Sequence, residues 1–321
     1  MSRSDQHDPS ARPAILLDAI HDDLDRGRGV PALSELFHGL DGLRADSGDA
    51  TWRAVREAVV DHDLRALIHQ DPMTRRSFEK PRGYAGDAVL LDYIYRLRVP
   101  DDAPDVGRAV YDYAVGRPAA RAVRLRREWL AHAIDRASDQ TGGRARVLSV
   151  ACGHLREAGL SAALARGGVE RLVALDADAE SLVEVERLGL DQVEPVEMSI
   201  GRLLARPDRF GTFDLSYSAG LYDYLEHDLA CRLTASLFAT LAPGGRLLVS
   251  NFLPTLPDAG YMETYMGWEL IYRTEEQLAS VADLVPEDEV AGWSTWSDPY
   301  GAIAYLEIER VGARAISPPA E

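Results

Sequence analysis

The chain has 321 residues, of which 46% are hydrophobic and 27% charged, and its formal net charge is -17 at pH 7. It is long enough to bury a large core, and its strong negative charge argues against nucleic acid as the main partner. Its two cysteines, Cys152 and Cys231, form no disulfide framework, and no metal-ligand spacing is present. No apolar run approaches the roughly 18 residues that span a bilayer, and the first residues are polar, so we expect a cytoplasmic protein without membrane insertion.

The first part of the chain, from about residue 13 to residue 136, shows apolar side chains at helical spacing. Helices are predicted over residues 14–25, from residue 31, around residues 52–67, from the Asp71-Pro72 pair, over 86–97, and over 118–137. On the last of these helices we expect four arginines at the surface: Arg121, Arg124, Arg126 and Arg127.

After residue 141 the pattern changes to short β-rich runs that alternate with helical segments. Strands are predicted over 146–150, 172–175, 192–197, 213–217, 246–251 and 302–308, with helices over 155–166, 179–188 and 229–241. Such alternation indicates an α/β fold with a mainly parallel sheet. Because ligands of these sheets bind beyond the carboxyl ends of the strands, we expect the functional residues there.

Two features follow the first two predicted strands. Residues 149–157 read Ser-Val-Ala-Cys-Gly-His-Leu-Arg-Glu, a turn whose small residues let backbone N–H groups approach a ligand closely. Asp176 ends the second strand 23 residues after Gly153, close to the offset at which an acid accepts hydrogen bonds from ribose hydroxyls. An ordinary tight turn and a helix N-cap would explain the same residues equally well.

The order of these features with two later ones resembles the class I S-adenosylmethionine (SAM) dependent methyltransferases. The later features are the polar end of the fourth strand, residues 213–219, and the Pro-Gly-Gly turn in residues 242–249. The resemblance covers about residues 140–310. It implies a Rossmann-like sheet of seven strands with a reversed final hairpin, and SAM as the cofactor. We therefore predict a helical domain over residues 1–138 and a SAM-binding domain over residues 139–321.

The segments 74–87, 153–157, 220–225, 251–252 and 261–273 resemble a narrower subgroup. It includes proteins of 3-hydroxypalmitic acid methyl ester biosynthesis and SAM-cyclising azetidine-2-carboxylate synthases. This resemblance implies that the N-terminal helical domain forms a lid over the SAM site. It leaves the substrate undefined.

The resemblance also implies the residues of the site. We expect the cofactor to contact Ala151, Cys152, Gly153, Arg156, Glu157, Asp176, Ala177, Ser199, Ser218, Ala219 and Gly220. Ser149 stands where these enzymes usually carry an acid, which makes Arg156 and Glu157 candidates for the carboxylate and the amine of SAM. Cys152 is expected to be a small packing residue. The candidate catalytic residues are His154, Tyr84, Tyr222 and Ser218, and His154 could instead contact the backbone or the cofactor.

Aromatic residues gather in the motif segments: Tyr84, Tyr222, Tyr224, Tyr261, Tyr265, Trp268 and Tyr272. Aromatic faces attract a sulfonium, so one or two are expected near it and the others in packing roles.

Three functions are consistent with these residues. The first is methyl transfer from SAM to a small-molecule carboxylate or hydroxyl, as in small-molecule biosynthesis. The second is cyclisation of SAM to azetidine-2-carboxylate with release of methylthioadenosine. The third is SAM binding without catalysis. Neither the acceptor nor the oligomeric state follows from the sequence.

Overall fold

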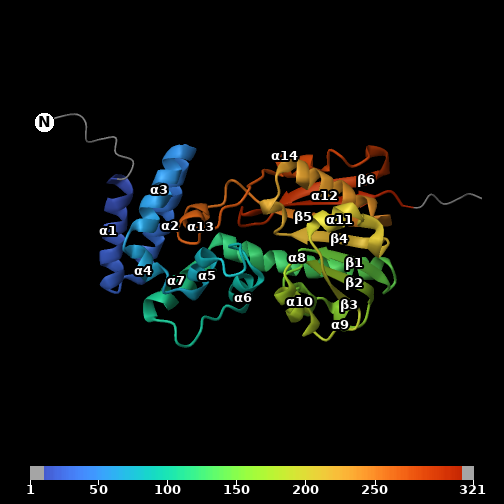
Figure 1. The fold of residues 1–321 in the computed structure, drawn as a ribbon, viewed down its shortest axis with the longest axis horizontal. Helices are drawn as coiled ribbons and strands as arrows, with labels where there is room; N and C mark the ends of the chain where they lie inside the picture. The colour runs from blue at the N-terminus through green and yellow to red at the C-terminus, as the bar shows by residue number, and fades with distance from the viewer. Residues whose placement is uncertain (1–10, 313–321) are drawn as a thin grey trace, which may run out of the picture. The chain divides into compact units, whose positions relative to one another are not determined.

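The computed structural model describes residues 11–312 and divides the chain into two compact units (Figure 1). Of the described residues, the helical unit contains 11–124 together with Thr255–Glu269, and the sheet unit contains Leu125–Pro254 together with 270–312. This division differs from the predicted boundary after residue 138. It falls inside one helix, α8, and it assigns a segment from the C-terminal half to the helical unit.

The helical unit contains most of the helices that the sequence predicts. They are α1 (Ala11–Asp25), α2 (Gly29–Ala45), α3 (Asp49–Asp61), α4 (Leu64–Ile68), α5 (Pro72–Glu79), α6 (Ala88–Arg96) and the start of α8 (Pro118–Gln140). Two further helices, α7 (Asp105–Val115) and α13 (Ala259–Thr264), were not predicted. Residues 52–67 form most of α3 and most of α4, not one continuous helix.

Buried aspartates fix where two of these helices begin. Asp71 accepts hydrogen bonds from the backbone N–H groups of Met73 (2.9 Å) and Thr74 (3.0 Å), with proline at the first helical position of α5. Asp87 accepts from the N–H of Leu90 (2.8 Å) at the start of α6, and its carboxylate also receives both Nε (2.9 Å) and Nη2 (2.7 Å) of Arg76. The segment between α5 and α6 is therefore closed by a bidentate ion pair.

The Thr255–Glu269 segment is part of the core of the helical unit. Tyr261 stacks on Phe37, with ring centroids 4.1 Å apart, and both side chains are fully buried. Gly260 lies so close to α2 that a Cβ atom there would be 2.7 Å from the backbone carbon of Leu40. Packing of this segment against α2 thus requires glycine at position 260.

The sheet unit contains seven strands in the order β3-β2-β1-β4-β5-β7-β6 (Figure 1). The strands are β1 (Ala145–Val150), β2 (Val169–Asp176), β3 (Val193–Glu197), β4 (Phe213–Ala219), β5 (Leu241–Phe252), β6 (Val290–Ser297) and β7 (Ile303–Arg310). The strands β1 to β5 pair in parallel, whereas β7 pairs antiparallel with both β5 and β6. This confirms the predicted Rossmann-like fold with a reversed final hairpin.

The Pro-Gly-Gly turn lies within β5. Phe213 of β4 pairs with Leu241 of β5, whereas Leu215 of β4 already pairs with Arg246 of β5. Residues 242–245 of β5 therefore loop out of the pairing. A Cβ atom on Gly245 would lie 2.7 Å from the carbonyl oxygen of Phe213, which explains the glycine.

The connections of the sheet unit are mostly short. They contain α9 (Ala162–Ala165), α10 (Ala179–Glu186), α11 (Ile200–Ala205), α12 (His227–Ala239), α14 (Glu275–Ala279) and short 3₁₀ segments. The helix predicted over 155–166 is instead a 3₁₀ turn, Arg156–Gly159, followed by α9. Ser161 between the two has an extended backbone and caps α9, which prevents one continuous helix.

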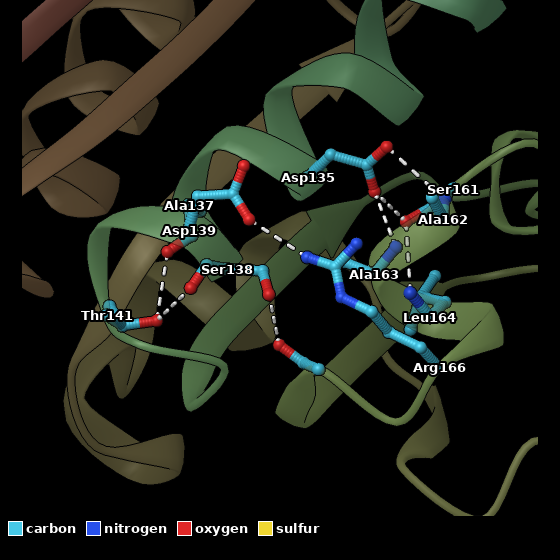
Figure 2. A network of polar contacts seen from close by, with 11 residues as sticks. Asp135, Ala137, Ser138, Asp139, Thr141, Ser161, Ala162, Ala163, Leu164 and Arg166 are labelled. Carbon is cyan, nitrogen blue, oxygen red and sulfur yellow. Dashed lines mark hydrogen bonds and ion pairs between the residues drawn. The ribbon is translucent and has the colours of Figure 1, made fainter.

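The end of α8 is fastened to the loops around α9 by a polar network (Figure 2). Asp135 accepts hydrogen bonds from Ser161 Oγ (2.6 Å) and from the backbone N–H of Ala163 (2.8 Å). Ser138 Oγ donates to the carbonyl of Gly168 (2.5 Å), just before β2. These bonds fix the C-terminal part of α8 next to the sheet.

Along residues 11–312, no helix has the length and apolar character needed to cross a membrane.

Candidate functional site

The turn after β1 has an unusual backbone. Ala151, Gly153 and Leu155 all have positive φ angles, of 54°, 54° and 50°. Two of these residues are not glycine, and such conformations are costly for residues with a Cβ atom. The backbone N–H of Cys152 donates to the carbonyl of Leu175 in β2 (3.0 Å), which anchors the turn to the neighbouring strand. The strained turn is therefore held by the sheet.

Asp176 at the end of β2 organises the same edge. Its Oδ2 accepts the N–H of Gly153 (2.8 Å) and its Oδ1 accepts the N–H of Asp178 (2.9 Å). Asp176 is only 9% exposed. Burial raises its pKa, and the hydrogen bonds that it accepts offset part of this rise. An ionised carboxylate has about four acceptor sites, so these two bonds leave acceptor capacity for a ligand. Asp178, not Asp176, is the N-cap of α10.

Two more predicted residues lie next to Asp176. Ala177 follows it directly and is exposed. Ser199 is the exposed residue that precedes α11, and the N–H of the adjacent Met198 donates to the carbonyl of Asp176 (2.8 Å). The turn after β1 and the ends of β2 and β3 thus share one edge of the sheet.

The end of β4 lies beside β1. Ser218 Oγ donates to the carbonyl of Val150 (2.9 Å), so its hydroxyl joins the two strands and is 1% exposed. The hydroxyl therefore has a structural partner in β1, and the catalytic and cofactor-binding roles of Ser218 stay predictions. Ala219 ends the strand, and Gly220 follows with φ of 102°, a conformation that favours glycine.

Glu157 is buried beside the same strands. Its Oε1 accepts the hydroxyl of Tyr217 (2.7 Å) in β4, and the side chain is 7% exposed. Burial raises the pKa of Glu157, while this hydrogen bond and the charges of Arg126 and Arg127 lower it. A carboxyl group in such a place can accept or hold a proton.

Arg156 is directed to other partners. Its Nη2 donates to Glu184 Oε2 in α10 (3.1 Å) and lies 3.3 Å from His154 Nδ1. His154 itself is 4% exposed, and Cys152 lies at the same turn with burial raising the pKa of its thiol well above the usual value. The high thiol pKa fits the packing role predicted for Cys152.

A second buried cluster joins the ends of β4 and β5. Asp223 Oδ1 accepts the N–H of Phe252 (2.7 Å), and burial raises the pKa of Asp223 to about 7. Arg273 donates to Asn251 Oδ1 (2.7 Å) and to the carbonyl of Tyr222 (2.7 Å), and Asn251 donates to the carbonyl of Ile271 (2.8 Å). This cluster fixes the loop after β4.

The hydroxyl of Tyr222 does not lie at the carboxyl ends of the strands. Tyr222 is fully buried in the hydrophobic core of the sheet unit, and its hydroxyl pairs with Thr234 Oγ1 in α12 (2.9 Å). Burial raises the pKa of this hydroxyl, which suits a packing residue better than the predicted catalytic one. Tyr84 lies in the helical unit between α5 and α6 and is half-buried.

The other predicted aromatics divide in the same way. Tyr261, Tyr265 and Trp268 belong to the helical unit and are buried there. Tyr224, at the surface, and Tyr272 belong to the sheet unit. Most of the set therefore has a packing role, as the sequence indicated.

Arg126 in α8 is the residue that sequence reasoning placed wrongly. It is 4% exposed, not on the surface, and its guanidinium nitrogens lie 3.6 and 3.7 Å from the position of a Cβ atom on Gly220. It recurs at four-residue spacing with Ala122, Leu130 and Ile134, all of which are buried. A charged residue in such an apolar stripe was the signal that could have identified it.

Within residues 11–312, no group of three or more His, Cys, Asp or Glu side chains could hold a metal ion.

No family model matches the chain, and no curated protein matches it. Among solved structures, it is similar to a possible exported protein from Bordetella parapertussis, with 18% identity, a TM-score of 0.59, and coverage of 97% of this chain and 100% of that one. At this identity the similarity shows a shared fold.

Weaker similarities are to methyltransferases. One is the N-methyltransferase NodS from Bradyrhizobium japonicum WM9 in complex with S-adenosyl-L-homocysteine, with 15% identity, a TM-score of 0.42, and coverage of 68% of this chain and 97% of that one. Another is an O-methyltransferase from Nostoc punctiforme PCC 73102, described as putative, with 14% identity, a TM-score of 0.45, and coverage of 77% and 71%.

Proposed function

We propose that the edge formed by β1, β2 and β4 binds SAM, and that the protein transfers its methyl group to a small-molecule carboxylate or hydroxyl. The observation that carries this proposal is the bond between Asp176 and the N–H of Gly153 across the strained turn. It places a carboxylate with remaining acceptor capacity beside a backbone that approaches a ligand closely. The ribose hydroxyls of SAM suit that carboxylate.

The chain's own residues would mainly position the reactants. A deprotonated acceptor oxygen forms a bond to the methyl carbon while the S–CH₃ bond breaks, and its electron pair stays on sulfur to give S-adenosylhomocysteine. Because the sulfonium already activates the methyl group, alignment and exclusion of water are the main contributions of the protein. An acidic acceptor loses its proton to solvent and needs no strong base.

Glu157 favours cyclisation of SAM as a second candidate. In that reaction the neutral α-amine attacks the γ-carbon, the S–Cγ bond breaks with its electron pair on sulfur, and the ring nitrogen loses a proton. The α-ammonium must first give up a proton. A buried carboxylate with a raised pKa, such as Glu157, is suited to receive it.

Mass spectrometry of the purified protein with SAM distinguishes these candidates. Methyl transfer predicts S-adenosylhomocysteine only when a carboxylate or hydroxyl acceptor is added. Cyclisation predicts methylthioadenosine and azetidine-2-carboxylate without any acceptor. Binding of SAM with neither product, even when carboxylate and hydroxyl acceptors are added, would indicate a non-catalytic binding protein. Failure of the folded protein to bind SAM would overturn the proposal. The lid role of the helical unit and a cytoplasmic location stay predictions.

A further inference from the structure

Arg126 carries a hydrogen-bonding capacity that the protein leaves unused. Its Nη1 is buried, yet it has no hydrogen-bond partner within residues 11–312. The guanidinium lies beside Gly220, immediately after β4, and so at the carboxyl end of the parallel strands. This is the edge on which Asp176 and the turn after β1 also lie.

A buried guanidinium without its hydrogen bonds is costly. Burying an ionised group is strongly unfavourable unless charge and hydrogen bonds compensate. The negative charges of Glu157 and Asp223 act on Arg126 and offset part of this cost. They do not fill the donor position at Nη1, which therefore points to a ligand acceptor.

The surrounding charges select the kind of acceptor. A planar carboxylate matches the guanidinium fork and brings a single negative charge. A phosphate would bring more negative charge close to Glu157 and Asp223 and would be repelled. A group that joins a carboxylate to an ammonium, as an α-amino acid does, offers a partner for the arginine and one for a nearby acid.

We propose that Arg126 binds the carboxylate of the methionine moiety of SAM. This inference rests on the proposed function, because it names the contact at one end of the same ligand. It replaces Arg156, to which the sequence assigned the role, since the guanidinium of Arg156 is paired with Glu184. Arg126 is thus a specificity residue for ligands that carry an amino-acid end.

The test compares three ligands by isothermal titration calorimetry. They are SAM, decarboxylated SAM, which lacks only the carboxylate, and methylthioadenosine, which lacks the amino-acid end. The variants are Arg126→Gln and Arg126→Lys, with Arg144→Gln, an exposed arginine before β1, as the matched control for charge. Thermal unfolding confirms that each variant is folded.

We expect Arg126→Gln to weaken SAM binding about 10- to 100-fold, with little change for decarboxylated SAM or methylthioadenosine. Arg126→Lys should fall in between, because lysine keeps the charge and loses the bidentate geometry. Equal losses for all three ligands, or unchanged SAM binding, would overturn the inference while leaving the proposed function intact. If the unmodified protein binds none of the ligands, the proposed function fails and the inference fails with it.

Discussion

Two buried acids of the helical unit and one buried arginine of the sheet unit differ in how completely the protein itself pairs them. In the helical unit, Glu263 accepts hydrogen bonds from Arg44 Nε (3.0 Å) and Trp52 Nε1 (2.6 Å), and Asp258 accepts from Arg117 Nε (2.7 Å) and the N–H of Ala119 (2.8 Å). Both oxygens of each carboxylate are used by the protein itself. In the sheet unit, Arg126 is equally buried and retains a donor without a partner among the described residues.

This difference separates polar groups that build the fold from polar groups that are kept for a ligand. A fully paired buried charge gives structural specificity, because removing either partner leaves the other unsatisfied. A buried charge with incomplete hydrogen bonding lowers stability, and it is retained where ligand binding requires it. Burial alone therefore does not identify a functional residue, whereas a buried charge with an unmet hydrogen bond at the carboxyl ends of the strands makes Arg126 a candidate.

The largest effect is expected at Glu263. Replacing it with alanine leaves Arg44 and Trp52 without their acceptor, and we expect the free energy of unfolding to fall by about 3–5 kcal/mol. The contrasting variant is Arg126→Met, which removes a charge that is already incompletely paired and should change stability by no more than about 1 kcal/mol. Urea denaturation measures both. Equal losses in the two variants would break the contrast between the units.

Asp176 tests the ligand side of the contrast. Asp176→Ala removes the acceptor of the Gly153 N–H and the proposed ribose contact, so SAM affinity should fall about 100-fold, which corresponds to roughly 2.7 kcal/mol. Asp191→Ala, at an exposed position before β3, is the control. Titration calorimetry provides the measurement. Wild-type affinity in Asp176→Ala would remove the main support for the proposed site.

Asp41 sharpens the comparison because it is an acid of the helical unit whose burial is only partly offset by hydrogen bonds and positive charges. Burial raises its pKa to about 7, with repulsion from Asp258 adding to this, against the hydrogen bond from the Gly260 N–H and the charges of Arg117 and Arg44. The folded state thus binds a proton more tightly than the unfolded chain does. Stability attributable to this group is complete below pH 4 and is lost as pH rises towards 7.

Asp41→Asn should remove that loss. We expect the variant to be more stable than the parent by about 1 kcal/mol at pH 8, a value reduced for partial exposure of the side chain, and by less at pH 5. Denaturation curves at the two pH values test this. A gain that is the same at both would show that the charge of Asp41 is not the cause.

The smallest effect is expected at Ser218. Ser218→Ala removes the bond to the carbonyl of Val150 and should lower the free energy of unfolding by about 1 kcal/mol. Denaturation and turnover should be measured on the same preparation. Unchanged stability with lost turnover would return Ser218 to the catalytic role that the sequence suggested.

Local signals explain what the sequence predicted correctly. Asp71 followed by proline marked the start of α5, because an N-cap and a first-turn proline act within one turn of chain. The spacing between Gly153 and Asp176 placed a carboxylate at the neighbouring strand end, because one βα unit fixes that distance. The seven strands and the reversed final hairpin came from the resemblance and not from periodicity.

Tertiary context explains the rest. Arg126 was placed on the surface because arginine usually lies there, and only its alignment with buried neighbours such as Leu130 indicated otherwise. Strand β6 escaped prediction because its central residues, such as Trp293, are exposed and show no apolar alternation. Tyr222 looked functional within a polar motif, and its burial depends on packing against α12.

The segment Thr255–Glu269 has a consequence for how the chain can be made and divided. It supplies Tyr261 to the stack with Phe37 and Glu263 to Arg44, although it is encoded after most of the sheet. During synthesis the helical unit cannot complete its core until residue 269 has left the ribosome, so its helices must wait for the five parallel strands to be translated. The same wiring means that no single cut in the gene can yield the helical unit as an independently folding fragment.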